Sequence, residues 1–268
     1  MEAKGDRMKL SRCLSLLCLL CCPLLAHAGS DAIITLDRPG KAPLYYIATA
    51  PDTPAKVGAI LFSGGDGTLN LAGKKTPPHI GNFLIRSREL FADRGIITAS
   101  FDPSGDSGPL VDGVRKSDLH VQEVSEVLAD FKHRFNLDHV FLIGTSRGTV
   151  SAAYVALPLH DRISGVVLTS SVFEASRQGT GLAGFDFARI QSPLLFVHHR
   201  SDSCVVTPPR DAERLQDRYT VVFIEGGEFG GGDACGPFSA HGYQGKEKET
   251  VDVIGDWMRA HVPSGDMP

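Results

Sequence analysis

The sequence has no surplus of basic residues, no internal repeat and no low-complexity segment. Its 27 lysines and arginines stand against 31 aspartates and glutamates, so no excess positive charge is available to neutralise a phosphate backbone, and we expect no nucleic-acid partner. Neither a heme signature nor a nucleotide-binding fingerprint occurs, so we expect no cofactor. The 268 residues are 42% hydrophobic and 22% charged, which is typical of a globular protein rather than a disordered, collagenous or coiled-coil chain.

The amino terminus has the pattern of a secretory signal peptide. Basic residues at positions 7, 9 and 12 precede an apolar run over 13–25, and Ala26-His27-Ala28 follows. This run is shorter than the roughly 20 residues that a membrane-spanning helix needs. We therefore expect cleavage after Ala28, no stable membrane insertion of the mature chain, and a secreted or periplasmic location. An uncleaved anchor, or lipid attachment at one of the cysteines in this segment, is the alternative.

The expected domain organisation is a signal peptide over 1–28 and a single domain over 29–268. Cleavage would remove four of the six cysteines and leave Cys204 and Cys235. An even number of cysteines in an exported chain predicts that they form a disulfide, because thiols oxidise in that compartment. The alternative is two unrelated buried thiols. Four basic and two acidic residues would leave with the signal, which lowers the net charge from −4 to −6.

Short runs rich in Val, Ile, Leu and Phe predict buried strands over 57–62, 96–101, 140–143, 163–168, 193–197 and 221–224. Segments with helical spacing lie between and after them, over 82–94, 117–135, 147–157, 211–218 and 247–261. This alternation predicts an α/β protein with a mostly parallel sheet and helices on both faces, because parallel strands need crossover connections. Two earlier runs, 33–36 and 44–48, have no helix between them and favour an antiparallel start to the sheet.

The longest weakly patterned segment covers 172–191. It has room for a loop and a short helix over the carboxyl edge of the sheet, but not for a large lid domain. We therefore expect an open substrate pocket, with Phe173, Phe185 and Phe187 as candidate apolar walls.

The pentapeptide Gly144-Thr145-Ser146-Arg147-Gly148 lies between a predicted strand and a predicted helix. In that context a G-x-S-x-G pattern indicates a sharp turn that holds a nucleophilic serine above the sheet. The small residues at 144 and 148 would let the helix pack closely behind the strand. The alternative is a tight turn with an incidental serine.

With this motif the chain resembles the α/β-hydrolase family over nearly all of its mature length. The resemblance implies a three-layer fold and the chain order nucleophile, acid, histidine. Asp202 follows a predicted strand as the family's acid does, and it is preferred over Asp211 and Glu225. His241 follows the last strand and precedes the last helix, as the family's histidine does. Ser146, Asp202 and His241 are thus the expected catalytic residues.

The resemblance also implies two backbone N–H donors for an oxyanion. One is the residue after the nucleophile, Arg147. The other should come from a glycine-rich loop, where Gly65 is our choice and Gly64 and Asp66 are alternatives. The family often has His-Gly where this chain has Ser63-Gly64. The Arg147 side chain is expected to form a structural ion pair, with recognition of an acidic substrate group as the alternative.

Cys204 is two residues after the expected acid, and Cys235 is six residues before the expected base. A disulfide would therefore tie together the two loops that set the geometry of the catalytic residues. The other histidines suggest no metal site, because no further ligands stand at fitting spacing.

These features predict an exported serine hydrolase that cleaves an ester or related acyl bond of a small-molecule substrate through an acyl-enzyme. The alternatives are a non-catalytic binding or scaffold protein with the same fold, and a serine peptidase. The sequence makes no prediction of the acyl group, the alcohol or the oligomeric state.

Overall fold

The computed structural model describes residues 1, 30–76, 81–229 and 232–266. The expected signal peptide, apart from Met1, and its cleavage site lie outside the described residues. The core of the fold is one eight-stranded sheet. Its strands are β1 (Ser30–Leu36), β2 (Leu44–Ala50), β3 (Val57–Phe62), β4 (Ile96–Asp102), β5 (His139–Thr145), β6 (Gly165–Thr169), β7 (Leu194–His199) and β8 (Thr220–Ile224).

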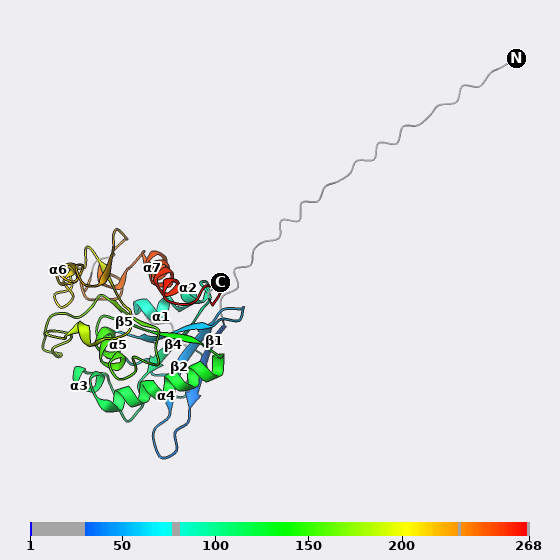
Figure 1. Cartoon of the computed structure of the whole chain (residues 1–268), viewed down its shortest axis with the longest axis horizontal. Helices are drawn as coiled ribbons and strands as arrows, with labels where there is room; N and C mark the ends of the chain where they lie inside the picture. Colours follow the sequence, from blue (N-terminus) through cyan, green and yellow to red (C-terminus); the bar gives the residue numbers. More distant parts are fainter. Residues whose placement is uncertain (2–29, 77–80, 230–231, 267–268) are drawn as a thin grey trace.

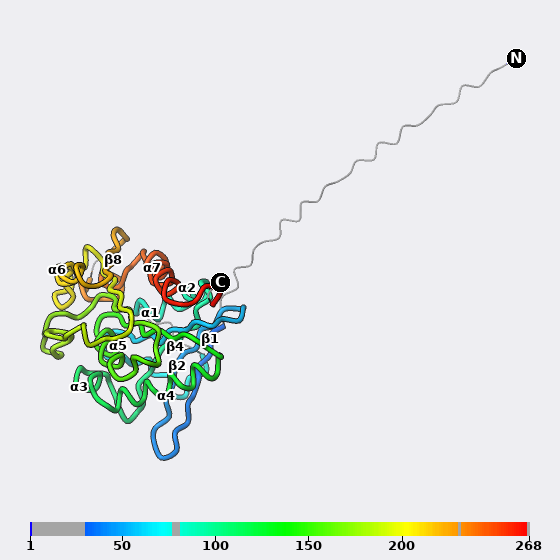
Figure 2. Tube along the Cα trace, viewed as in Figure 1, coloured from blue at the N-terminus to red at the C-terminus, as the bar shows by residue number. Residues whose placement is uncertain are grey.

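The strand order is β1-β2-β4-β3-β5-β6-β7-β8. β2 is antiparallel to both β1 and β4, and every other pairing is parallel. Figure 2 shows β1 and β8 on opposite sides of the molecule, as this order requires. The prediction of a mostly parallel sheet with an antiparallel start is confirmed. The carboxyl ends of β3 to β8 therefore meet at a single edge of the sheet.

Helices cover both faces of the sheet, as expected (Figure 1). They are α1 (Phe83–Arg86), α2 (Arg88–Ala92), α3 (Asp112–Arg115), α4 (Asp118–Phe135), α5 (Gly148–Ala156), α6 (Pro209–Glu213) and α7 (Glu247–Ala260). Within the described residues, none is both long and apolar enough to cross a bilayer.

Alternate residues of the central strands supply the two halves of the core, because successive side chains of a strand point to opposite faces. Ile60 on β3 belongs to the cluster that includes Phe131 of α4 and Val150 of α5. Its neighbour Leu61 belongs to the cluster on the other face, with Ile254 of α7. All of these side chains are completely buried.

The helix predicted over 82–94 is divided at Ser87, where the backbone leaves the α region (φ −99°, ψ 5°). The division coincides with a buried ion pair between Arg88 and Asp31 on β1. The Arg88 guanidinium also donates to the backbone carbonyl of Ile85 at 2.6 Å. Two other helices differ from expectation: α6 ends at Glu213, and α3 was not predicted.

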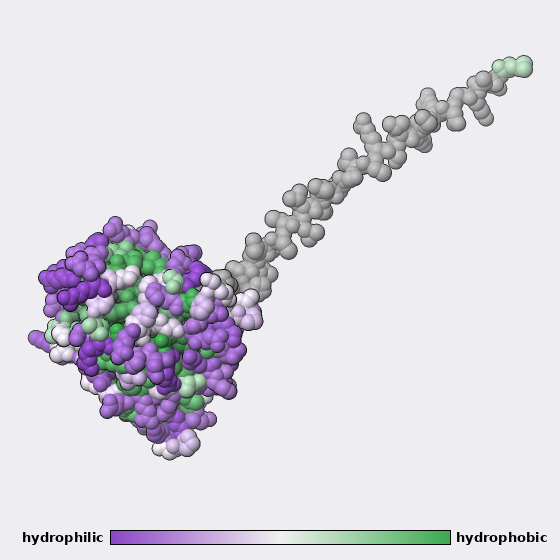
Figure 3. All heavy atoms as spheres, viewed as in Figure 1, coloured by the Kyte–Doolittle hydropathy of each residue, from purple (hydrophilic) through white to green (hydrophobic). Residues whose placement is uncertain are grey.

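The segment over 172–191 is a loop with one short 3-10 helix, η1 (Phe187–Arg189). The described chain therefore has no large lid domain, as predicted. On the face shown in Figure 3, hydrophilic residues cover most of the rim, and hydrophobic residues gather in patches toward the middle.

His120 of α4 is buried between the rings of Phe62 and Phe101, and neither of its ring nitrogens has a hydrogen-bond partner among the described residues. Burial, and to a lesser degree the nearby Arg115 charge, lowers its pKa to about 3. Burial likewise lowers the pKa of His198 to about 3. Since the unfolded chain takes up these protons first, the free energy of unfolding should decrease as the pH falls from about 6.5 toward 3.

We predict that His120→Leu reduces this acid dependence, by about 2–3 kcal/mol at pH 4.5 relative to pH 7. Urea unfolding at both pH values, followed by the fluorescence of Trp257, measures it. His133→Leu, at an exposed position of the same helix, is the matched control and should keep the wild-type acid dependence. Equal acid dependence in wild type and His120→Leu would contradict the prediction.

Candidate active site

Ser146 lies on the turn between β5 and α5, in a left-handed backbone conformation with φ of 52°. For a residue other than glycine this conformation costs about 1–2 kcal/mol. Hydrogen bonds on both sides hold the turn: Ser146 N–H donates to the Thr169 carbonyl at 3.0 Å, and Thr149 N–H donates to the Ser146 carbonyl at 2.9 Å. The serine side chain therefore projects from the carboxyl end of a central strand.

The glycines on either side of this serine are required by close backbone packing. A Cβ at Gly148 would lie 2.0 Å from the carbonyl oxygen of Phe62 on β3. A Cβ at Gly144 would lie 2.4 Å from the carbonyl oxygen of Gly148. Both distances are far inside van der Waals contact, so only glycine fits at either position. The turn, the helix behind it and β3 thus approach one another as closely as backbones allow.

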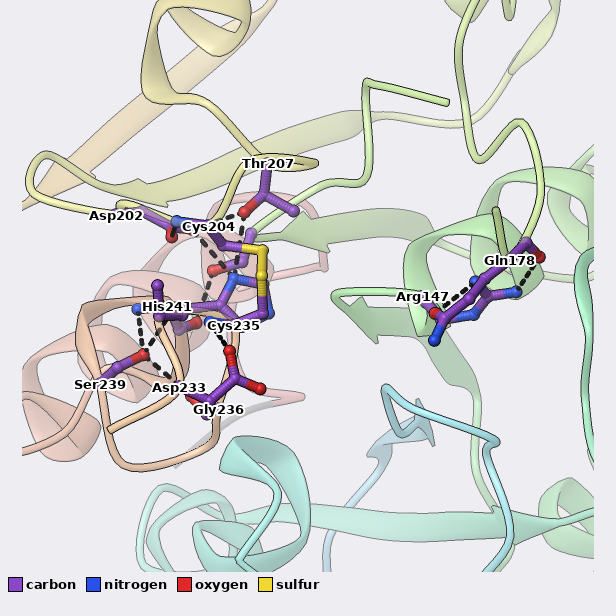
Figure 4. The surroundings of a disulfide bond; sticks show 12 residues. Arg147, Gln178, Asp202, Cys204, Thr207, Asp233, Cys235, Gly236, Ser239 and His241 are labelled. Carbon is purple, nitrogen blue, oxygen red and sulfur yellow. Dashed lines mark hydrogen bonds and ion pairs between the residues drawn. A yellow bond between two sulfur atoms is a disulfide. The ribbon is translucent and has the colours of Figure 1, made fainter. Parts of the chain in front are cut away.

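Asp202 and His241 meet through a hydrogen bond, although 39 residues separate them (Figure 4). Asp202 follows β7, and His241 lies in the short 3-10 helix η2 (Ala240–Gly242) that precedes α7. The distance from His241 Nδ1 to Asp202 Oδ2 is 3.0 Å, and both side chains are nearly inaccessible to solvent. The other carboxylate oxygen, Oδ1, accepts a hydrogen bond from the backbone N–H of Cys204 at 2.9 Å.

The Asp202–His241 pair is supported by polar residues that the sequence analysis did not identify. Thr207 Oγ1 donates to Asp202 Oδ2 at 2.8 Å and lies 3.1 Å from His241 Nδ1. Ser170 Oγ donates to the His241 carbonyl at 2.8 Å, and the Tyr243 hydroxyl donates to the carbonyl of Val197 on β7 at 2.7 Å. These bonds join η2 to the end of the sheet. No local motif marks the three residues, so no sequence signal was available to find them.

Ser146 and His241 both line a cavity of about 230 Å³, together with Gly64, Asn82 and Pro237. In the part of the chain that the structure describes, neither Ser146 Oγ nor His241 Nε2 has a hydrogen-bond partner. A second cavity, of about 520 Å³, also reaches Ser146. The serine hydroxyl and the unbonded imidazole nitrogen are thus both open to a molecule bound in this region.

The glycine-rich loop after β3 lies directly beside the serine. A Cβ at Gly64 would be 2.9 Å from Ser146 Cβ, and Gly65 has a left-handed φ of 61°. The backbone N–H groups of Gly64, Gly65, Asp66 and Arg147 have no hydrogen-bond partner among the described residues. The loop and the start of α5 therefore present unpaired donors on the side of the sheet where Ser146 lies.

A buried arginine, also missed from the sequence, holds this loop in place. Arg115 is completely buried, and burial lowers its pKa to about 9. Its guanidinium donates to the carbonyls of Leu110 at 2.8 Å and Gly65 at 3.1 Å, and to Ser151 Oγ at 2.8 Å. Because the C=O and N–H of a trans peptide point in opposite directions, fixing the Gly65 carbonyl also fixes the direction of the Asp66 N–H.

The Arg147 side chain forms an ion pair with Asp112 at the start of α3 and donates to the side-chain and main-chain oxygens of Gln178, each at 3.0 Å. This agrees with the structural interpretation of the side chain. The alternatives for the acid lie elsewhere in ion pairs: Asp211 with Arg214, and Glu225 with Arg200.

A disulfide joins Cys204 to Cys235, with 4.6 Å between the Cα atoms (Figure 4). It connects the loop of Asp202 to the loop that leads to His241. Cys235 lines both cavities beside Ser146. The two loops that carry Asp202 and His241 are therefore covalently linked next to the cavities.

The expectation that Phe173, Phe185 and Phe187 form pocket walls is wrong for these two cavities, since none of them lines either one. Phe187 packs on Phe185 at 5.2 Å and on Phe196 of β7 at 5.0 Å between ring centroids. Phe173 stacks on His198 at 5.3 Å. The rings of Phe173 and Phe187 thus pack against β7 instead of lining the cavities, which removes apolar area from water.

Histidines 198 and 199 have structural roles. His198 Nε2 accepts from the backbone N–H of Ser171 at 2.9 Å. His199 Nδ1 accepts from Ser201 N–H at 3.1 Å, and its Nε2 donates to the Gly226 carbonyl at 2.7 Å. Across the described residues, no group of three or more His, Cys, Asp or Glu side chains is placed to hold a metal ion.

Comparison with known proteins places this geometry in a common architecture. No family model and no curated protein matches the sequence. Three solved structures are similar over most of their length. They are Est1E from Butyrivibrio proteoclasticus (TM-score 0.60, 14% identity, 86% of this chain and 98% of that one), a lidless α/β serine hydrolase from Xanthomonas campestris (0.59, 16%, 88% and 96%) and a dienelactone hydrolase from Anabaena variabilis (0.61, 15%, 88% and 100%). The chain therefore has the α/β-hydrolase fold.

We predict that Gly148→Ala lowers the free energy of unfolding by at least about 2–3 kcal/mol, because its Cβ would overlap the Phe62 carbonyl. Urea unfolding followed by Trp257 fluorescence measures the change. Gly113→Ala in α3 is the matched control: a Cβ there meets nothing within 4 Å, so this variant should be neutral or slightly more stable. Wild-type stability of Gly148→Ala would show that the close approach is not required.

Proposed function

Since the chain has the α/β-hydrolase fold, we propose that it is an exported serine hydrolase that cleaves carboxylic esters of small molecules. The observation that carries the proposal is the hydrogen bond between Asp202 and His241 in a protein where His241 lines the same cavity as Ser146. The names of the similar structures, an α/β serine hydrolase and a dienelactone hydrolase among them, support hydrolysis as the reaction class.

In the proposed reaction the bond from His241 Nδ1 to Asp202 keeps the proton on Nδ1, so Nε2 is the basic nitrogen. His241 Nε2 accepts the proton of Ser146 as Oγ attacks the ester carbonyl, and Asp202 stabilises the imidazolium that forms. The imidazolium then protonates the departing alkoxide. Water, deprotonated by the same nitrogen, attacks the acyl-enzyme and releases the acid and the free serine.

The proposed oxyanion donors are the backbone N–H groups of Arg147 and Gly65, which have no other partner among the described residues. Preorganised N–H groups stabilise the negative charge of the tetrahedral intermediate without having to reorient during the reaction. Arg115 restrains the loop that carries this donor through its hydrogen bond to the Gly65 carbonyl, and the same bond fixes the direction of the N–H of Asp66, the alternative donor.

The Cys204–Cys235 disulfide supports the export part of the proposal, since disulfides persist in oxidising compartments. The amino-terminal pattern of charge and hydrophobicity is the second support.

We predict that a fluorophosphonate probe labels the wild-type protein and not Ser146→Ala. Ester turnover should fall by orders of magnitude in Ser146→Ala and His241→Ala, and by about 10⁴ in Asp202→Asn, where the imidazole loses the partner that sets its tautomer. Asp211→Asn, which removes a half-buried carboxylate paired with Arg214, is the control and should keep full activity.

A folded wild-type protein that neither takes the probe nor hydrolyses any p-nitrophenyl ester would support the non-catalytic scaffold instead. Comparing an ester with an amide of the same acyl group separates the esterase from a peptidase.

We also predict that breaking the disulfide lowers activity at urea concentrations where the sheet is still folded. The bond closes a loop with a sequence separation of 31 residues, for which the chain-entropy estimate of stabilisation is about 3–4 kcal/mol. Activity and far-UV circular dichroism of Cys204→Ser/Cys235→Ser, measured along one urea series, test this. The prediction would be contradicted if the variant lost activity and circular dichroism at the same urea concentrations. It would also be contradicted if turnover were equal with and without the disulfide.

A further inference from the structure

The larger cavity at Ser146 differs in chemistry from the smaller one. The smaller cavity is lined mostly by glycines and apolar residues, including Phe83 and Pro237. The larger one, of about 520 Å³, is lined on one side by a turn that carries Arg177 and Gln178. A bound molecule with its reacting carbonyl at Ser146 therefore has a more apolar compartment on one side and a more polar one, which contains Arg177, on the other.

The turn that carries Arg177 is held rigidly to the start of α5. Reciprocal backbone hydrogen bonds join Ser176 and Gly179, at 2.8 and 3.2 Å, which leaves Arg177 and Gln178 at the tip. The Arg147 guanidinium bonds both oxygens of Gln178 (Figure 4). The residue that follows the proposed nucleophile thus fixes the position of the turn relative to Ser146.

Asp112 completes this attachment. Its carboxylate pairs with Arg147 and accepts the backbone N–H of Gly181 at 2.7 Å. A Cβ at Gly179 would lie 2.2 Å from Asp112 Oδ2, so the carboxylate fills the space beneath the turn. The positive charge of Arg147 is paired with the Asp112 carboxylate, and the Arg147 side chain is only 12% exposed.

Arg177 is exposed, and it has no ion pair or hydrogen bond to any of the described residues. Arg210 of α6, by contrast, is paired with Glu174. Asp233 also lines this cavity, and its carboxylate accepts a hydrogen bond from Cys235 N–H at 2.9 Å. The Asp66 carboxylate, in the glycine-rich loop, accepts one from Thr68 N–H at 3.1 Å. Among the described residues neither carboxylate forms an ion pair with Arg177, so its guanidinium can bind a molecule in the cavity.

We propose that Arg177 binds a carboxylate on the substrate, so that the preferred substrates are half-esters of dicarboxylic acids or similar esters with an anionic end. This inference rests on the proposed function and names its substrate class. A guanidinium matches the geometry of a carboxylate and can donate two parallel hydrogen bonds to it. Arg177 then determines substrate specificity and takes no part in the bond-breaking steps.

The experiment compares two substrates with the same reacting ester: mono-4-nitrophenyl glutarate, which ends in a carboxylate, and methyl 4-nitrophenyl glutarate, in which a neutral methyl ester replaces that carboxylate. In Arg177→Ala we expect kcat/KM for the carboxylate substrate to fall roughly tenfold, mainly through KM, and to change little for the neutral one. Arg177→Lys should retain part of the preference. Arg189→Ala, an exposed arginine of the same loop that lines neither cavity at Ser146, should leave both substrates unchanged.

Three results would overturn the proposed subsite: equal changes for both substrates in Arg177→Ala, no change for either, or a preference for an ester with a terminal ammonium group. None of these results would contradict the proposed chemistry at Ser146. A readout that needs no turnover is glutarate binding to Ser146→Ala, measured by calorimetry. Weaker glutarate binding in Ser146→Ala/Arg177→Ala than in Ser146→Ala supports the subsite. If the wild type also hydrolyses no ester, the proposed esterase function fails while the subsite is supported. Equal binding by the two variants overturns the subsite.

Discussion

The contact between Gly148 and the carbonyl end of β3 is the constraint on which the rest of the site depends. A Cβ at position 148 would lie 2.0 Å from the Phe62 carbonyl oxygen, so α5 begins against the neighbouring strand with no side chain between them. This approach forces the chain from β5 into α5 within a few residues. It holds Ser146 at φ 52°, where a residue with a side chain is otherwise disfavoured. The strain of that one residue is compensated by the packing of two strands and a helix.

The topology of the sheet assembles the other groups around this turn. Because β3 to β8 run parallel, the segments that follow β3, β5 and β7 all leave from the same edge, and they carry Gly65, Ser146 and Asp202. His241 reaches that edge from the segment between β8 and α7, where Ser170 and Tyr243 hydrogen-bond η2 to the sheet. The disulfide then joins the segments that carry Asp202 and His241. Four segments far apart in sequence are thus brought to one edge of the sheet.

Buried polar side chains do most of the positioning near the pocket. Arg115 donates to a carbonyl of the glycine-rich loop, and Thr207 donates to Asp202. Asp112 pairs with Arg147, which in turn bonds the turn that carries Arg177. Each of these groups is buried with several hydrogen bonds, which makes its geometry strict, since an unpaired polar group in the interior is unfavourable. Arg147, an unusual residue directly after the serine, belongs to this set. It links the turn that carries Ser146 to the wall of the larger cavity.

The sequence by itself determined the order of the strands and of the longer helices, the strand–turn–helix around Ser146 and the expectation that Cys204 pairs with Cys235. These follow from local patterns: hydrophobic runs, glycine spacing and an even number of cysteines. Only the tertiary structure decided that the aromatic rings of 172–191 pack on the sheet instead of the pocket, that Ser87 divides a predicted helix, and that Arg115 and Thr207 support the site. The reason is that such contacts depend on which side chains the fold brings within about 3–4 Å of one another, and no periodicity along the chain encodes those distances.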